Sequence, residues 1–314
     1  MKNKREKISF VIPCYGSEGS VSLVINEIKD VLSEKDNYDY EIIAVNDCSP
    51  DNVLQVLRKE AALDQEVKVV DLAINRGRHN ALMCGCRYAT GDYIVFIDDD
   101  QQCPMDCFWQ LIEPLESGEY DVAIAKYPQK KQSKFKNLGS KVNDMVANWL
   151  LGKEKGLKFS NFAIMRKFIR DEVIRYQNPY PYLSGLMIRA TSRVINVEME
   201  ERERMIGVGN YTFKKSFALW MNNFTSFSVK PLRLATSCGV VAAFLGMLMA
   251  LYTVIHKLVV PTVAVGYSSI MAVLLFVGGM IMLMLGLIGE YIGRIYISLN
   301  SAPQYVVREE INIK

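Results

Sequence analysis

Two long stretches without a charged side chain occupy the C-terminal part of this 314-residue chain, from Leu234 to Ile255 and from Leu258 to Gly289. Each exceeds the roughly 18 consecutive apolar residues that mark a candidate transmembrane helix. Buried helices of a water-soluble protein are the alternative, but two such runs in succession favour membrane spans. We therefore predict two transmembrane helices, at about 234–256 and 264–289, within a membrane region of residues 233–290.

Basic residues predict how these helices lie in a membrane, because cytoplasmic loops are enriched in lysine and arginine. Such residues flank the outer ends of the pair at Lys214, Lys215, Lys230, Arg233 and Arg294. Only His256 and Lys257 lie near the short loop between the two stretches. We therefore expect a multi-pass protein of the inner or plasma membrane, with both termini and the N-terminal domain in the cytoplasm.

A segment rich in aromatic residues, 211–232, precedes the first apolar stretch. Its aromatic side chains lie between basic residues, which is typical of an amphipathic helix on the surface of an anionic membrane. An amphipathic helix packed on the preceding domain is the alternative. After the second span, residues 291–314 are predicted to form a cytoplasmic tail.

Residues 1–210 alternate between short apolar runs and segments with helical periodicity. The predicted strands are Ile8–Pro13, Tyr40–Asn46, Val67–Leu72, Tyr93–Ile97 and Asp121–Ala125. Predicted helices between them include Val21–Leu32, a helix capped by Asp51, and Met105–Leu115. This alternation is typical of a doubly wound, mostly parallel α/β domain. Because such sheets bind ligands at the carboxyl ends of their strands, we expect a site where the polar loops after the first four strands meet.

The fourth strand leads into three consecutive aspartates in the sequence YIVFIDDDQQCP, residues 93–104. If the extended backbone continues past the strand, Asp98 and Asp100 share one face and Asp99 points elsewhere. With the amide of Gln102, these two carboxylates would form an oxygen site suited to Mg²⁺ or Mn²⁺ and to a bound diphosphate. A solvated acidic turn is the alternative. The chain has no GxGxxG after its first strand and no GxxxxGK[ST] motif, so a standard dinucleotide or P-loop site is not supported.

The net charge indicates which partners are unsupported, and the cysteines indicate the redox compartment. A formal net charge of only +3 gives no electrostatic case for binding nucleic acid. Seven cysteines are scattered without a disulfide pattern or paired zinc half-sites, so we expect thiols in a reducing compartment.

Four motifs, in order, resemble the nucleotide-sugar domain of glycosyltransferase family 2: VIPCYGSEGS, VNDCSPD, NRGRHNALMCG and FIDDDQQCP. Three later segments, ERERMIGVGNYTFKK, SFSVKPLR and GEYIGRIY, are similar to the membrane-bound polyprenyl-phosphate glycosyltransferases of that family. The resemblance covers the chain from Ile8 to about Val307. It implies a GT-A fold, an inverting sugar transfer and a divalent metal, Mg²⁺ or Mn²⁺.

The resemblance assigns donor-binding roles to Pro13, Tyr15 and Glu18 in the nucleotide loop, and to Asp47 as the residue that reads the base. Two positions differ from the usual family pattern, with Gly16 in place of asparagine and Asn46 where many members have aspartate.

The metal and the diphosphate have their own residues in the family pattern. Asp98, Asp100 and Gln102 match the metal site, and Asp99 takes the variable donor-side position between the aspartates. Arg204 matches an arginine on the diphosphate, although Gly209 replaces a common serine in its loop. The resemblance therefore makes Asp98, Asp100 and Arg204 the catalytic residues.

On the acceptor side, Lys126, Lys136 and Ser140 resemble the residues that hold the lipid phosphate. Lys136 and Ser140 are four positions apart, so on a helix they share a face and can bind one anion. A solvated lysine-rich segment is the alternative. Near residues 159–162, where many members have an aspartate or a glycine–serine pair, this chain has Ser160 and Asn161. A phosphate acceptor is already anionic and needs no base there, whereas a sugar hydroxyl does.

These patterns predict transfer of a sugar from a nucleotide-diphosphate donor, most simply a UDP-sugar, to polyprenyl phosphate such as undecaprenyl phosphate. The product would be a lipid-phosphate sugar for cell-envelope glycan modification. A processive polysaccharide synthase is one alternative, although its QxxRW motif is missing and two spans are few for a polymer channel. A non-catalytic membrane protein that binds nucleotide sugars is another. The sequence leaves a homo-oligomer open.

Overall fold

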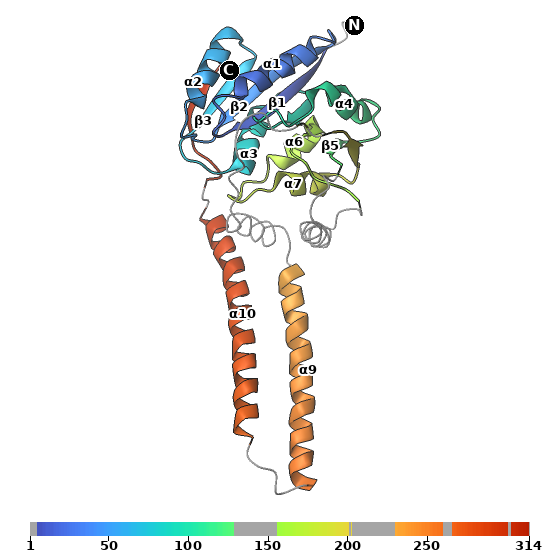
Figure 1. Ribbon diagram of the computed structural model, residues 1–314, viewed down its shortest axis with the longest axis vertical. Helices are drawn as coiled ribbons and strands as arrows, with labels where there is room; N and C mark the ends of the chain where they lie inside the picture. Colours follow the sequence, from blue (N-terminus) through green and yellow to red (C-terminus); the bar gives the residue numbers. More distant parts are fainter. Residues whose placement is uncertain are drawn as a thin grey trace. The chain divides into compact units, whose positions relative to one another are not determined.

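The computed structural model describes residues 5–128, 156–200, 202, 230–259, 266–300 and 303–313. The chain divides into two compact units (Figure 1). The first combines Met1–Phe217 with Ala302–Lys314, and the second is Ala218–Ser301. The C-terminal end of the chain therefore belongs to the N-terminal unit.

The first unit is built on one eight-stranded sheet in the order β7-β5-β6-β4-β1-β2-β3-β8. Strands β1 to β4 are parallel to one another, as are β5 and β7, whereas β6 and β8 run antiparallel to their neighbours. The strands are β1 (Glu6–Cys14), β2 (Tyr38–Asn46), β3 (Val67–Leu72), β4 (Tyr93–Phe96), β5 (Val122–Lys126), β6 (Ala163–Arg166), β7 (Val194–Glu198) and β8 (Val307–Ile311). The five predicted strands are confirmed, and β6, β7 and β8 are additional.

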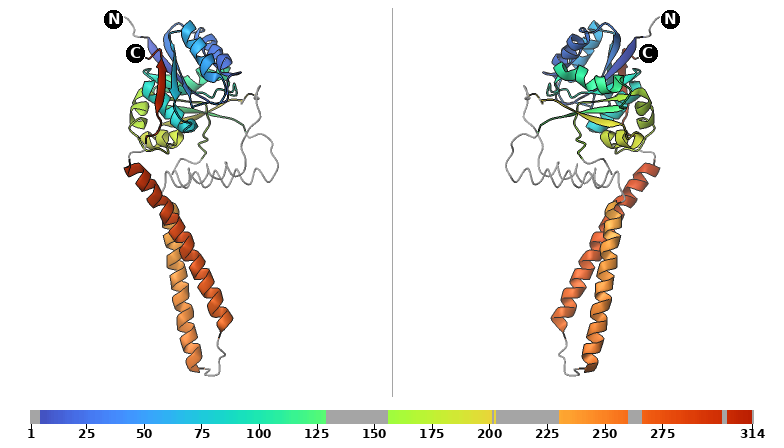
Figure 2. Two further views of the ribbon diagram at one scale, coloured as in Figure 1. Left: turned by 90° about the vertical axis from the view of Figure 1, so that its left-hand side faces the viewer. Right: turned by 90° about the vertical axis from the view of Figure 1, so that its right-hand side faces the viewer.

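Helices cover both faces of this sheet, as expected for a doubly wound domain (Figures 1 and 2). The helices of this unit are α1 (Val21–Leu32), α2 (Val53–Leu63), α3 (Arg78–Tyr88), the 3-10 turn η1 (Met105–Cys107), α4 (Phe108–Glu116), α6 (Lys167–Val173) and α7 (Leu183–Ala190). Instead of Asp51, Asn52 is the N-cap residue of α2, although the Asp51 carboxylate still accepts the Val53 N–H at 3.3 Å.

The two faces of the sheet pack against different helices because alternate strand residues point to opposite sides. Helices α1, α2 and α4 share one core, in which the rings of Phe10 and Phe108 lie 5.4 Å apart. Helix α3 packs on the other face of β1 and β2. There a Cβ at Gly85 would lie 2.3 Å from Val11 Cγ1, so only glycine allows this close approach. This packing fixes the carboxyl ends of the parallel strands at one edge.

A buried ion cluster surrounds Glu41 on β2, whose side chain is fully buried. Its carboxylate accepts hydrogen bonds from Lys68 Nζ, Ser9 Oγ and the Thr90 N–H, each at 2.6 Å, and pairs with Lys7 Nζ at 2.9 Å. Burial raises the pKa of Glu41, but the hydrogen bonds from these groups outweigh it and lower the pKa to about 2. The carboxylate is therefore ionised in the folded protein.

We expect Glu41→Gln to lower the free energy of unfolding by about 2–4 kcal/mol at pH 7. This is somewhat below the cost of breaking a fully buried pair, because both lysines are partly exposed. Since the folded-state pKa is lowered, this stability is present above the ordinary pKa of 4.5 and is lost as the pH falls toward 2. Thermal unfolding of the full chain at pH 7 and pH 3 checks this. Glu172→Gln, in an exposed pair with Arg175, is the control; an equal effect of the two substitutions would contradict the prediction.

The second unit contains two long helices, α9 (Lys230–Val259) and α10 (Tyr267–Leu299), which run antiparallel (Figures 1 and 2). Within the described residues, one stretch, Phe276–Leu299, is long and apolar enough to cross a membrane, and Ala235–Leu248 is a shorter apolar stretch. Large apolar side chains such as Phe276 and Met282 are exposed on these helices. Helix α10 extends ten residues beyond the predicted end at 289. The predicted interfacial segment lies outside the described residues, apart from the first residues of α9.

Candidate active site at the carboxyl edge of the sheet

The three aspartates lie in a turn directly after β4. The strand ends at Phe96, and the backbone turns at Asp99 and Asp100 into Gln101, whose φ is 60°. An extended backbone past Ile97, the condition for Asp98 and Asp100 to share one face by alternation, is therefore not met, because the turn interrupts the strand geometry. The partners of each carboxylate, rather than strand geometry, determine where it points.

Asp98 is held by two side chains that come from distant parts of the chain. Arg78, the first residue of α3, donates to Asp98 Oδ1 from Nε at 2.8 Å and lies 2.7 Å away through Nη2. The side-chain amide of Asn161 donates to Asp98 Oδ2. Both carboxylate oxygens therefore have strong donors, and the negative charge of Asp98 is balanced by a guanidinium.

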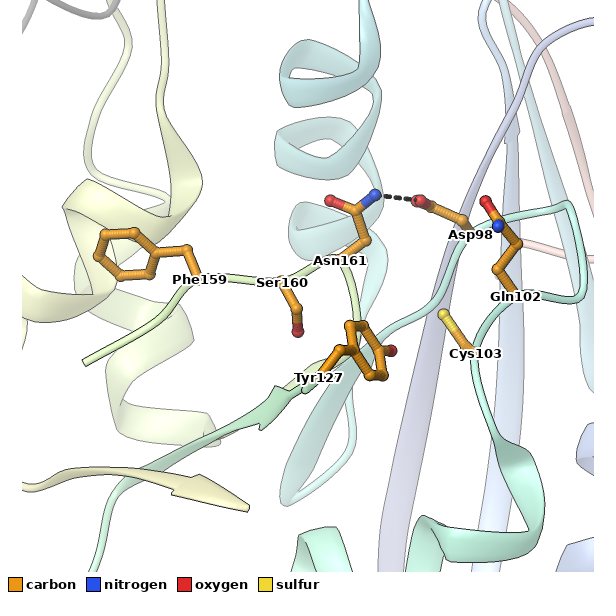
Figure 3. A pocket seen from close by; sticks show the side chains of 7 residues that line it. All are labelled: Asp98, Gln102, Cys103, Tyr127, Phe159, Ser160 and Asn161. Atoms are coloured by element: carbon orange, nitrogen blue, oxygen red, sulfur yellow. Dashed lines mark hydrogen bonds between the residues drawn. The ribbon is translucent and has the colours of Figure 1, made fainter. Parts of the chain in front are cut away.

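A cavity of about 260 Å³ opens beside Asp98. Figure 3 shows Asp98 and Gln102 on one side, the segment 159–161 facing them, and the ring of Tyr127 between. The residues that line it are Asp98, Gln102, Cys103, Tyr127, Phe159, Ser160 and Asn161. Burial raises the pKa of the Cys103 thiol to about 12, so this thiol is neutral at physiological pH. Among these lining residues, Asp98 is thus the one ionised group.

Asp99 points to the first loop instead of the cavity. Its carboxylate accepts the Tyr15 N–H at 3.0 Å, and its carbonyl accepts the Ser20 hydroxyl at 2.5 Å. Burial raises the pKa of Asp99 to about 6, against the lowering effect of hydrogen bonds from Ser17 and Tyr15. Asp99 therefore joins the turn after β4 to the loop after β1, and these hydrogen bonds, not strand alternation, set where its carboxylate points.

The loops after β1 and β2 are joined by a second set of hydrogen bonds. The Gly16 N–H donates to Ser49 Oγ at 2.8 Å, and the Glu18 N–H donates to Asp51 at 2.9 Å. In return, the Glu18 carboxylate accepts the Asn52 N–H at 2.7 Å. The predicted donor residues of the first loop are therefore brought to the same edge as the aspartates, and Tyr15 is 55% exposed. Pro13 lies inside β1, in register with Val45.

Asp47 lies at the end of β2 and is buried. Its two carboxylate oxygens accept the backbone N–H groups of Arg76 and Gly77, each at 2.7 Å. Burial raises the pKa of Asp47, and these N–H groups lower it only in part. Gly77 has φ of 84°, a conformation that glycine adopts readily, and this places both N–H groups toward Asp47. In the structure Asp47 therefore holds the loop that leads into α3.

Lys126, at the end of β5, forms an ion pair with Glu198 of β7 at 2.7 Å. It immediately precedes Tyr127 of the cavity, so the β5 end does reach the site. The predicted residues Lys136, Ser140 and Arg204 lie outside the described residues. Their roles rest on the family resemblance.

The donor set near Asp98 fits a hard divalent cation, because Asp98, Asp100 and Gln102 offer only oxygen ligands from two carboxylates and an amide. Within the described part of the chain, no three acidic, histidine or cysteine side chains converge on a common point. Asp100 accepts the Gln102 N–H at 3.2 Å. A cation that binds Asp98 therefore has to compete with the Arg78 guanidinium.

Sequence reasoning missed several residues of this site. Arg78 stands in the motif NRGRHNALMCG, but nothing in the motif shows that it reaches Asp98. Tyr127 and Phe159 lie outside the four family motifs, and Cys103 stands in FIDDDQQCP without a predicted role. Asn161 lies where many family members have an aspartate or a glycine–serine pair, and its hydrogen bond to Asp98 was not predicted.

The fold and the site together define the class of protein. It is an α/β protein of the GT-A fold, with an acidic turn and a polar cavity at the carboxyl ends of its strands. Solved structures share this fold. Glucosyl-3-phosphoglycerate synthase from Mycobacterium tuberculosis matches with a TM-score of 0.54 and 19% identity, over 71% of this chain and 79% of that one. A second structure of that enzyme, in complex with Mn²⁺ and UDP-glucose, matches with a TM-score of 0.52 over 69% and 76% of the two chains, also at 19% identity.

The sequence comparisons give the family. Residues 9–178 match the model of glycosyl transferase family 2, and residues 230–295 match the GtrB C-terminal hairpin. The chain belongs to glycosyltransferase family 2 and is a glycosyltransferase. The family resemblance and the GT-A fold are thus confirmed.

Relatives extend over nearly the whole chain. An uncharacterized glycosyltransferase, YkcC, of Bacillus subtilis is 31% identical over 98% of this chain and 94% of its own length. An undecaprenyl-phosphate 4-deoxy-4-formamido-L-arabinose transferase of Proteus mirabilis is 30% identical over 99% and 96%. A prophage bactoprenol glucosyl transferase homolog of Escherichia coli is 27% identical over 96% and 98%.

Proposed function

We propose that this chain transfers a sugar from a nucleotide-diphosphate donor, in particular a UDP-sugar, to polyprenyl phosphate, in particular undecaprenyl phosphate. The transfer inverts the anomeric centre, uses Mg²⁺ or Mn²⁺, and takes place at the cytoplasmic face of the membrane. The product is a lipid-phosphate sugar that serves cell-envelope glycan modification. Relatives named for undecaprenyl phosphate and bactoprenol support the lipid acceptor, and a fold neighbour in complex with UDP-glucose and Mn²⁺ supports the donor and the metal.

One observation of the site favours a phosphate acceptor over a hydroxyl acceptor. Among the described residues that line the cavity, the one ionised group is Asp98, and both of its oxygens are already bound by Arg78 and Asn161. A hydroxyl acceptor needs a free base to remove its proton, whereas a phosphate is anionic at neutral pH. The cavity therefore favours a phosphate acceptor, with catalysis by positioning and charge.

The proposed roles divide the edge of the sheet into a donor side and an acceptor side. Asp98, Asp100 and Gln102 would hold the metal, which when bound neutralises the diphosphate and stabilises it as a leaving group. Pro13, Tyr15, Glu18, Asp47 and Asp99 form the donor side, with Arg204 on the diphosphate. Lys126, Lys136 and Ser140 hold the acceptor phosphate.

The test is product analysis with purified full-length protein in detergent, a panel of nucleotide sugars, and either undecaprenyl phosphate or unphosphorylated undecaprenol. We expect a lipid-phosphate sugar, detected by mass spectrometry, with the phosphate and no product with the alcohol. A polymer would instead support a processive synthase, and binding of nucleotide sugar without any product would support a non-catalytic protein. Product from undecaprenol at a similar rate would overturn the choice of acceptor.

The pairing of β8 with β3 supports the proposed membrane topology. Val69 and Val70 of β3 are in register with Ile311 and Glu310 of β8, so the chain returns to the first unit after α10. A chain that leaves a folded domain and returns to the same sheet must cross a membrane an even number of times. If α10 crosses, α9 must cross as well. This supports two spans with both termini on the same side, and the flanking basic residues favour the cytoplasmic side.

We therefore expect reporters fused at either terminus to indicate the cytoplasm, and a reporter inserted near Pro261 to indicate the far side. The physical reason is the strand pairing together with the basic residues that flank the two apolar stretches. A fusion of a phosphatase active only outside the cytoplasm and one of a fluorescent protein active only inside measure this in intact cells. A C-terminus outside the cytoplasm would overturn the topology.

A further inference from the structure

The C-terminal segment 303–313 is tied to the first unit along its whole length. The Asn312 amide donates to the carbonyls of Ala61 and Val67 at 2.6 and 2.9 Å, and the buried Gln304 amide donates to those of Tyr176 and Asn178 at 3.0 and 2.8 Å. Strand β8 lies at the edge of the sheet, coloured red in Figure 2. The segment after α10 is thus an integral part of the domain that carries the candidate active site.

Within this segment, Arg308 reaches the carboxyl edge of the sheet. Its guanidinium donates to Asp71 at 3.4 Å and to the Ala73 carbonyl at 3.0 Å. The Asp71 side chain is only 2% exposed, and Arg308 is the cation paired with it among the described residues. A buried carboxylate requires such a partner, because an isolated buried charge is strongly unfavourable.

Asp71 in turn fixes Asn46, at the end of β2. The Asn46 amide nitrogen donates to Asp71 at 2.7 Å within the buried interior. Because an ionised carboxylate only accepts hydrogen bonds, Asn46 must turn its nitrogen to Asp71 and its oxygen the other way. That oxygen accepts the Ser49 N–H at 3.2 Å.

Ser49 connects Asn46 to the loops after β1 and β2. Its hydroxyl accepts the Gly16 N–H at 2.8 Å and donates to Asp51 at 2.5 Å, and Asp51 accepts the Glu18 N–H at 2.9 Å. A continuous series of hydrogen bonds therefore runs from Arg308 to the loops after β1 and β2. Both loops are donor-side elements of the proposed function.

We propose that Arg308 is a positioning residue for the nucleotide-diphosphate donor, so that the strand following α10 completes the donor site. The guanidinium holds the Asp71 carboxylate in place, Asp71 orients Asn46, and Asn46 orders the loops that receive the nucleotide. This inference rests on the proposed function. It makes donor affinity depend on a residue that lies far from the donor motifs in the sequence and after the apolar helices.

The test is titration of full-length protein in detergent with UDP, together with donor KM, kcat and thermal unfolding. We expect Arg308→Gln to weaken UDP binding and raise donor KM about tenfold, typical of losing one charge-assisted hydrogen bond, with kcat within about twofold. Arg308→Lys retains the charge and should restore most of the affinity. The matched control is Glu309→Gln, on the same strand as Arg308, which breaks the ion pair between Glu309 and Arg58 of α2 and should leave UDP affinity unchanged.

A double substitution separates positioning from general destabilisation. In an Asp71→Asn background, Arg308→Gln should add little further loss, because the charge that Arg308 balances is gone. Unchanged UDP binding by Arg308→Gln, or equal weakening by Arg308→Gln and Glu309→Gln, would overturn the role of Arg308 alone. Failure of the wild-type protein to bind UDP would instead overturn the proposed donor, and the role of Arg308 with it.

Discussion

Replacing Asp98 or Asp100 by asparagine is expected to lower kcat about 10²–10³-fold, the size of effect seen when one group that stabilises developing charge is removed. Each substitution deletes a charged oxygen ligand for the divalent metal in the proposed site. Steady-state turnover with Mn²⁺, and Mn²⁺ titration followed by electron paramagnetic resonance, measure the two consequences separately. Asp92→Asn is the matched control, since Asp92 accepts the Lys7 N–H at the opposite end of β4.

Arg78 supplies a further check on the same site. Because its guanidinium binds Asp98, Arg78→Gln should tighten Mn²⁺ binding in the titration while Asp98→Asn weakens it. Asp99→Asn should affect metal binding less than either neighbour, since its carboxylate points to the Tyr15 N–H. Full activity in EDTA, or a wild-type rate for Asp100→Asn, would remove the basis for the metal assignment.

Asp47→Ala is expected to weaken nucleotide binding about 10²–10⁴-fold. The substitution removes two charge-assisted hydrogen bonds, worth about 1.5–3 kcal/mol each, and leaves the N–H groups of Arg76 and Gly77 without their acceptor. Calorimetric titration of the full-length protein with UDP measures the loss. Asp51→Ala, in the neighbouring loop, removes hydrogen bonds with less burial and should cost less.

A second substitution at this position, Asp47→Asn, distinguishes two roles for Asp47. The family resemblance makes it the residue that reads the base, whereas the structure shows it holding the loop before α3. If it reads the base, Asp47→Asn should change the preference among UDP, GDP and CDP. If it holds the loop, all three nucleotides should weaken by the same factor. We expect the second result, because both carboxylate oxygens are already occupied.

The sequence by itself determined the strands β1 to β5 and the edge at which the site lies, and the resemblance of its motifs to a known family implied the GT-A class. Apolar runs of strand length and helical periodicity are local signals, and the carboxyl ends of parallel strands must meet at one edge. The motifs therefore placed Tyr15, Asp47 and Asp98 in one region without any coordinates. Another local signal, two long runs without a charged residue, indicated the two C-terminal helices.

Only the tertiary structure decided how these residues are partnered. The turn at Gln101 ends the extended backbone and so sets where the aspartates point. Asp98 accepts hydrogen bonds from Arg78 in α3 and from Asn161 just before β6. The strand β8, with the sequence VREEI, has too much charge for a typical strand pattern, yet it completes the sheet and brings Arg308 to Asp71. Local patterns specify which elements form, whereas these contacts join residues far apart in the chain and depend on the packing of the elements that carry them.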